Sequence, residues 1–159
     1  RGGSISLDPN LRKELKYDIE TEERFAQLVR MSDLLLPSGE ELELAAGVDG
    51  EAAAVARLFE LGPREIVLKR GEEGATCFLS DGTTENAPAF QVDEVDPTGA
   101  GDCFGGAYVA CRRLGMSVES ALTYGSAAGA RNVAVRGPME GAGTQAELDE
   151  FIQTTKRLQ

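Results

Sequence analysis

The stretch Thr98-Gly99-Ala100-Gly101-Asp102 constrains the fold of this chain more than any other. Two glycines flank an alanine, an aspartate follows, and small and apolar residues come next. We interpret the stretch as a loop that opens a helix. Glycine lets the backbone approach a ligand closely, and the first N–H groups of a helix lack a partner within it. Such groups can bind an oxyanion, and Asp102 beside them could accept a proton. An anion-binding loop next to a base suits phosphoryl transfer to an alcohol. The alternative interpretation of the stretch is an ordinary glycine-bearing turn without a ligand.

Short apolar runs alternate with helical patterns along the rest of the chain. Strands are expected over residues 4–8, 34–36, 65–69, 75–79 and 83–86, and helices over 21–31, 38–47, 51–61, 104–114, 117–135 and from 144 onward. The first strand is expected to be buried. Phe25, Leu28 and Val29 should share the buried face of the first helix. Asp81-Gly82 predicts a two-residue hairpin turn. Strands that alternate with helices indicate an α/β layered fold with a mainly parallel sheet.

Composition excludes several functions. The net charge of −11 disfavours a nucleic-acid or anionic-membrane partner, and no apolar run is long enough to span a membrane. Histidine is absent, so a general base must be a carboxylate, lysine, cysteine or tyrosine, and Ser-His-Asp, Cys-His and His-zinc sites are excluded within this chain. The three cysteines form no CxxC pair, which favours buried, reduced thiols and a cytoplasmic location.

Residues 96–104, Asp-Pro-Thr-Gly-Ala-Gly-Asp-Cys-Phe, closely resemble the D-[TP]-T-G-A-G-D-x-F signature of the PfkB (ribokinase-like) carbohydrate kinases. The resemblance covers essentially the whole chain and matches the C-terminal half of a family member. It implies a three-layer Rossmann-like fold, incomplete at the N-terminus, in which residues 1–159 are the C-terminal part of the kinase domain and the half with the lid is absent. It also implies ATP-dependent phosphorylation of a sugar hydroxyl. Asp102 would be the base, and the N–H groups of Gly99, Ala100 and Gly101 would form the anion hole.

Two further segments are similar to nucleotide-binding parts of the family. Residues 69–74 resemble its [KT]-x-G-x-x-G segment, in which Lys69, Gly71 and Gly74 would meet ATP; taken alone, the segment is equally a strand-turn-strand hairpin. Ser126 lies where the family lines its adenine pocket. The small residues around Ser126 equally allow tight helix packing.

The resemblance also implies metal sites. Glu41 lies where the family has N-x-x-E and would help to hold Mg²⁺, although Ser38 replaces the usual asparagine. The alternative is a helix start with acidic residues in its first turn. Many members bind a monovalent cation such as K⁺, and members without one also exist. The loop of Asp96 and Thr98 would face that cation, together with three carbonyl groups, those of Asn132, Val135 and Gly137.

Residues 8–12 are the most informative about substrate. They resemble the D-x-N-x-R segment of the branch that contains 2-keto-3-deoxygluconate kinase and fructokinase. Asn10 and Arg12 would contact the sugar, and an arginine can bind a carboxylate bidentately; the alternative is a surface arginine near a turn. We therefore expect a 2-keto-3-deoxygluconate kinase. The alternatives are a ketohexose kinase, for fructose or tagatose, and an inactive nucleotide-binding fragment. A homodimer would form through the absent lid.

Overall fold

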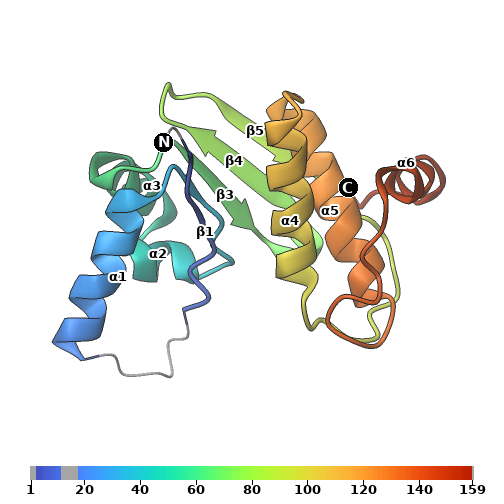
Figure 1. The fold of residues 1–159 in the computed structure, drawn as a ribbon, viewed down its shortest axis with the longest axis horizontal. Helices are drawn as coiled ribbons and strands as arrows, with labels where there is room; N and C mark the ends of the chain where they lie inside the picture. The colour runs from blue at the N-terminus through green and yellow to red at the C-terminus, as the bar shows by residue number, and fades with distance from the viewer. Residues whose placement is uncertain (1–2, 12–17, 159) are drawn as a thin grey trace. The chain divides into compact units, whose positions relative to one another are not determined.

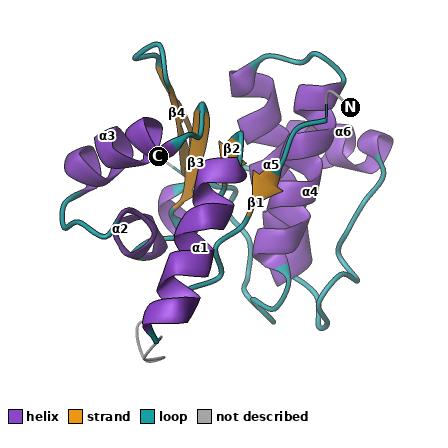
Figure 2. Cartoon of the chain, turned by 60° about the vertical axis from the view of Figure 1, so that its left-hand side comes forward, coloured by secondary structure: helices purple, strands orange, loops and turns teal. Residues whose placement is uncertain are grey.

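The computed structural model describes residues 3–11 and 18–158 (Figure 1). These residues form a five-stranded sheet in the order β1-β2-β3-β4-β5. Figure 2 shows the strands in orange among the purple helices. The strands are β1 (Ser6–Leu7), β2 (Leu34–Leu35), β3 (Glu65–Lys69), β4 (Ala75–Leu79) and β5 (Thr84–Ala87). The β1–β2 and β2–β3 pairs are parallel, with Ser6 opposite Leu34 and Leu34 opposite Glu65. Parallel strands that alternate with helices confirm the predicted α/β class.

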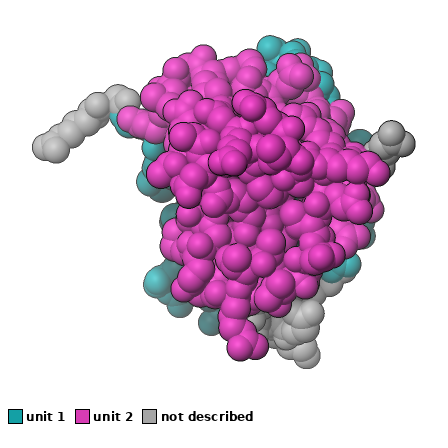
Figure 3. Space-filling model, turned by 90° about the vertical axis from the view of Figure 1, so that its right-hand side faces the viewer, with its two compact units in different colours: residues 1–69, 77–84 teal, residues 70–76, 85–159 magenta. Residues whose placement is uncertain are grey.

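The chain divides into two compact units, coloured separately in Figure 3. The first unit contains residues 1–69 and 77–84, and the second contains residues 70–76 and 85–159. Among the residues that the structure describes, none of the helices combines the length and the apolar character that a membrane crossing needs.

The first unit contains three helices in its described part, α1 (Ile19–Met31), α2 (Glu41–Ala46) and α3 (Glu51–Leu61). Asp18 caps α1, because its carboxylate accepts a hydrogen bond from the Thr21 N–H at 2.7 Å. Gly47 ends α2 in the left-handed conformation, with φ 68°. Side chains from the helices and strands form one buried apolar core, which includes Val29, Leu35, Leu42, Ala54, Leu58, Ile66 and Leu68.

Three local predictions in the first unit were wrong. Ile5 is 46% exposed, because β1 is the outermost strand in the order of the sheet and is covered less than predicted. Leu28 is 51% exposed on α1, whereas Val29 is fully buried. The hairpin turn contains three residues, 80–82, because the Leu79 N–H donates to the Thr83 carbonyl at 2.9 Å. A two-residue type I′ turn needs two residues with positive φ, and here Gly82 alone has one.

The second unit contains the short 3₁₀ helix η1 (Gly71–Glu73) and the helices α4 (Ala100–Arg113), α5 (Val118–Val133) and α6 (Gln145–Thr154). Small residues of α5 face α4: an added Cβ on Gly125 would lie 3.1 Å from the Phe104 ring, and one on Gly129 would lie 3.3 Å from the Ala100 carbonyl oxygen. The predicted close packing against this glycine-bearing face is confirmed.

Helix α6 begins where the sequence predicts. Thr144 and Glu147 form a capping box, in which the Thr144 N–H donates to Glu147 at 2.7 Å. The Tyr124 hydroxyl of α5 donates a hydrogen bond to the Asp149 carboxylate of α6. The three cysteines are free and buried, as expected.

Candidate functional site

The predicted anion loop lies at the start of α4, in the second unit. Gly99 is the N-cap residue and has φ 77°, a conformation that glycine adopts without strain. A Cβ at this position would lie 1.7 Å from the Pro138 carbonyl oxygen, so the close approach of two backbone segments also requires glycine. The Ala100 N–H donates to the Pro97 carbonyl at 3.3 Å. Among the described residues, no hydrogen bond uses the N–H groups of Gly99 and Gly101.

Two side chains connect this loop to the segment that follows α5. The Asp96 carboxylate accepts hydrogen bonds from the N–H groups of Thr98 and Gly137, both at 3.0 Å. The hydrogen bonds from Thr98, followed by the one from Gly137, hold the pKa of Asp96 below its ordinary value. The Asn132 amide donates to the Thr98 carbonyl at 2.8 Å and accepts from the Gly141 N–H at 3.2 Å. The loop therefore has a defined shape before any ligand binds.

The residues predicted to surround a monovalent cation are all in the second unit, and these contacts bring several of them together. Two of their carbonyl groups accept other hydrogen bonds, that of Thr98 from the Asn132 side chain and that of Asn132 from the Val135 N–H at 3.2 Å. In the described part of the chain, no group of three or more aspartate, glutamate or cysteine side chains is arranged to hold a metal ion. The cation site stays a prediction.

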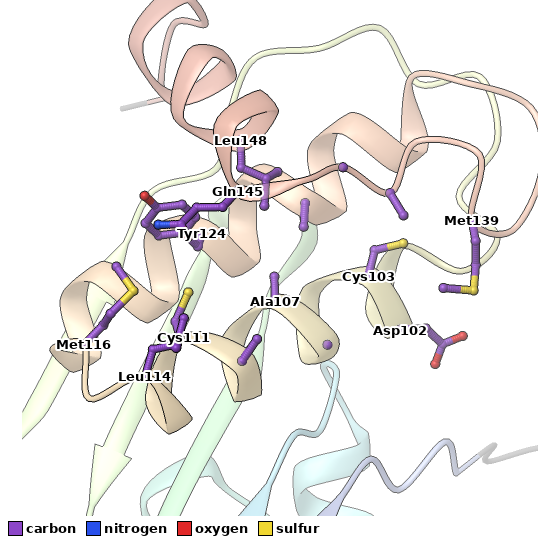
Figure 4. Close-up of a pocket in the computed structure, with 15 residues that line it drawn as sticks. Asp102, Cys103, Ala107, Cys111, Leu114, Met116, Tyr124, Met139, Gln145 and Leu148 are labelled. Carbon is purple, nitrogen blue, oxygen red and sulfur yellow. The ribbon is translucent and has the colours of Figure 1, made fainter.

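A cavity of about 320 Å³ lies beside Asp102 in the second unit (Figure 4). Asp102 and Met139 are at one end, and Leu114 and Met116 are at the other (Figure 4). Burial, followed by the charge of Asp102, raises the pKa of the Cys103 thiol. A thiol with a raised pKa is a poor nucleophile, and the neighbouring Asp102 side chain is exposed.

The first unit contains a separate polar cluster around Lys69, which ends β3. The Lys69 side chain is 10% exposed and forms an ion pair with Asp8, directly after β1. Glu41, at the start of α2, accepts a hydrogen bond from the Ser38 N–H at 2.6 Å. Burial raises the pKa of Glu41, and the Asp8 carboxylate raises it further, whereas Lys69 lowers it. The structure thus brings Lys69 and Glu41 together and adds Asp8.

Asp8 was not predicted as a site residue. The available signal was its position at the carboxyl end of a strand, where open α/β sheets bind ligands. Asn10 follows with φ 45°, the one non-glycine residue with clearly positive φ in the described part of the chain. Strained backbone of this kind is common at functional sites. The prediction for Arg12 lies outside the described residues.

The remaining predicted nucleotide contacts are in the second unit. Gly71 begins η1 and Gly74 follows its last residue, with φ 58° and 91°. A Cβ on Gly74 would lie 2.1 Å from the Ala87 carbonyl oxygen, so the hairpin itself requires this glycine. Ser126 is 9% exposed, and its hydroxyl is the one buried side-chain polar atom without a partner among the described residues. A buried hydroxyl without a partner costs stability, which a hydrogen-bonding ligand could recover.

Comparison with known proteins relates the chain to carbohydrate kinases. The family described as "pfkB family carbohydrate kinase" matches residues 2–145. The 2-dehydro-3-deoxygluconokinase of Thermoproteus tenax is 32% identical over 150 residues, which are 93% of this chain and 46% of that protein. The 5-dehydro-2-deoxygluconokinase of Clostridium tetani is 30% identical over 83% of this chain and 40% of its own length.

Solved structures agree with the sequence relatives. A putative ribokinase II from E. coli, in complex with ATP and Mg²⁺, is 41% identical with a TM-score of 0.91, over 96% of this chain and 49% of its own. A fructokinase from Vibrio cholerae, solved with fructose, ADP and a potassium ion, is 26% identical with a TM-score of 0.82, over 95% of this chain and 51% of its own. The chain therefore spans about half the length of the proteins that it matches.

Proposed function

The chain belongs to the pfkB family of carbohydrate kinases, and from this premise we propose that the full-length protein transfers a phosphoryl group from ATP to a sugar hydroxyl. The observation that carries the proposal is the start of α4. There, the N–H groups of Gly99 and Gly101, which have no partner in the described part of the chain, adjoin an exposed carboxylate, Asp102. Backbone N–H groups in this position stabilise the oxygens of a transferring phosphoryl group.

In this proposal Asp102 accepts the proton of the attacking hydroxyl. Asp102 lies in the first turn of α4, where the helix dipole favours a negative charge. The chain contains no histidine to replace it. Catalysis then rests on the positioning of the reactants and on charge stabilisation, with no covalent intermediate on the protein.

We assign Mg²⁺ to Glu41, with Asp8 as a second carboxylate close to it. Carboxylate oxygens are the protein ligands that Mg²⁺ prefers, and Mg²⁺ retains several of its waters. When bound with ATP, the ion would neutralise the charge that develops on the phosphate oxygens. The E. coli relative solved with ATP and Mg²⁺ supports this cofactor pair. The fructokinase solved with a potassium ion supports K⁺ as an additional ligand of the 96–98 loop.

The preferred substrate in this proposal is 2-keto-3-deoxygluconate. The relative from Thermoproteus tenax, named as a 2-dehydro-3-deoxygluconokinase, supports a sugar acid. A ketohexose is the alternative, supported by the fructose complex of the Vibrio cholerae enzyme.

The test is a substrate panel on the purified full-length protein with ATP and Mg²⁺. The panel contains 2-keto-3-deoxygluconate, 5-keto-2-deoxygluconate, fructose, tagatose and ribose. ADP release gives kcat/KM, and mass spectrometry identifies the phosphorylated product. We expect 2-keto-3-deoxygluconate to have the highest kcat/KM. A faster reaction with fructose or tagatose would establish the alternative, and ATP binding without turnover of any sugar would refute a kinase.

A further inference from the structure

We propose that the side chain of Asn132 is a positioning residue, which holds the anion loop in the shape that receives the phosphoryl oxygens. The inference rests on the proposed function. It differs from the predicted role of Asn132, in which the backbone carbonyl faces a cation. The side-chain amide acts through the Thr98 carbonyl and touches no reactant.

The hydrogen bonds of the Asn132 amide connect two segments that are distant in sequence. Asn132 is fully buried near the end of α5. Its Nδ2 donates to the Thr98 carbonyl oxygen at 2.8 Å, across 34 positions of the chain. Its Oδ1 accepts from the Gly141 N–H at 3.2 Å, across 9 positions. One planar group on a rigid helix therefore fixes the loop before α4 and the loop after α5 at the same time.

The backbone around Asn132 leaves no room for a different arrangement. A Cβ on Gly141 would lie 2.4 Å from the Asn132 Cα, so this segment packs directly on the helix. A Cβ on Gly99 would lie 1.7 Å from the Pro138 carbonyl oxygen, so the same segment also packs on the anion loop. A shift of residues 138–141 is therefore transmitted to Gly99.

The substitution Asn132→Asp tests this role with almost no change in side-chain size. An ionised carboxylate has no donor, and it would place a negative charge against the Thr98 carbonyl oxygen.

Amide hydrogen exchange of the full-length protein measures the loop without reference to activity. In Asn132→Asp at pH 8 we expect the amides of Thr98 and Cys103 to exchange on the order of ten-fold faster than in the wild type, after correction for intrinsic rates. The Gly141 amide keeps an acceptor oxygen in this variant and should change less. Leu122→Ala is the matched control, because Leu122 is also fully buried on α5 but lies outside the loop contacts. If the aspartate variant does not fold, the same exchange measurement is made on Asn132→Ser, whose side chain is neutral and smaller.

Steady-state kinetics then tests the catalytic consequence. A displaced loop should lower kcat about ten- to hundred-fold and change the KM for ATP and sugar less than three-fold. Unchanged exchange in the Asn132 variants overturns the inference whether or not the protein is a kinase. Faster exchange with unchanged kcat overturns the catalytic part. A wild type that phosphorylates no sugar refutes the proposed function, and the exchange data still decide whether Asn132 holds the loop.

Discussion

Asp8 and Lys69 form a part-buried ion pair although 61 positions separate them along the chain. The pair joins the residue after β1 to the last residue of β3. The two partners are not equally buried, because the Lys69 side chain is 10% exposed and that of Asp8 is 33% exposed. Removal of Asp8 and removal of Lys69 should therefore lower the free energy of unfolding by different amounts.

Asp8→Asn should destabilise the first unit more than Lys69→Met. The first change leaves an ammonium group buried without its counter-charge, whereas the second leaves a carboxylate that water can reach. We expect Asp8→Asn to lower the free energy of unfolding by about 1–3 kcal/mol, measured by urea denaturation. The control is Arg57→Met, which breaks the exposed pair with Glu60 and should cost about 0–1 kcal/mol. Equal losses for Asp8→Asn and Arg57→Met would contradict the burial argument.

Glu41→Gln should weaken the activation of the enzyme by Mg²⁺ about ten- to hundred-fold. Because burial raises the pKa of Glu41, its carboxyl group gains a proton at a higher pH than an ordinary glutamate. Mg²⁺ affinity of the wild type should therefore fall as the pH drops through that raised pKa, and Glu41→Gln should lack this dependence. Activity is titrated with Mg²⁺ at several pH values, and the exposed Glu94→Gln is the control. An unchanged Mg²⁺ requirement would remove Glu41 from the metal site.

Asp102→Asn should lower kcat about 10²–10⁴-fold, because loss of a general base acts on the transition state. The affinity for ATP should stay within about three-fold of the wild type, since an amide preserves the shape of the side chain. Asp93→Asn, on another exposed aspartate, should have normal turnover. Stopped-assay turnover and calorimetric ATP binding separate the two effects, and near-normal turnover in Asp102→Asn would refute the assignment of the base.

Gly99→Ala and Gly115→Ala form a matched pair, because the two glycines have φ 77° and 79°. An alanine at either position carries the same backbone strain, about 1–2 kcal/mol. At position 115 nothing lies within 4 Å of the new Cβ, whereas at position 99 the Pro138 carbonyl oxygen lies at 1.7 Å. We expect Gly99→Ala to be clearly less stable in thermal denaturation and to lose activity as well. Similar melting temperatures for the two variants would show that the close approach to Pro138 is not required.

Asp96→Asn should reduce stability in a pH-dependent way. Hydrogen bonds depress the pKa of Asp96 in the folded state below its ordinary value of 3.8. A depressed pKa contributes stability that is present above pH 3.8 and is lost as the pH falls through the folded-state pKa. The melting temperatures of wild type and variant should therefore differ at pH 7 and converge once the pH falls below the folded-state pKa of Asp96. A difference that does not change with pH would show that the charge of Asp96 contributes nothing.

The sequence pattern correctly predicted those helices and strands whose first and last residues depend on neighbours in the sequence. Helix α3 ends at Leu61 because Gly62-Pro63 follows, and β3 has the predicted bounds because an apolar run fills it. The errors at Ile5 and Leu28 have a different origin. Leu28 lies in a correctly predicted helix and Ile5 directly before β1, and the exposure of both depends on which neighbours the tertiary fold supplies.

In the candidate site, too, short-range features could be predicted and long-range contacts could not. The loop before α4 could be predicted because two closely spaced glycines allow the backbone to approach a ligand and an aspartate beside them can accept a proton. The ion pair of Asp8 and the two hydrogen bonds of the Asn132 side chain could not, because each connects residues that no local pattern relates. Asn132 was predicted for its carbonyl group, and the structure shows what its amide does.

The contact between Gly99 and Pro138 also has an evolutionary consequence. Every amino acid other than glycine carries a Cβ, so position 99 is closed to substitution while the Pro138 carbonyl stays where it is. A lineage could open this position only by moving the backbone of residues 138–141 first. Position 99 and residues 138–141 should therefore change together among homologues, although they are distant in the sequence.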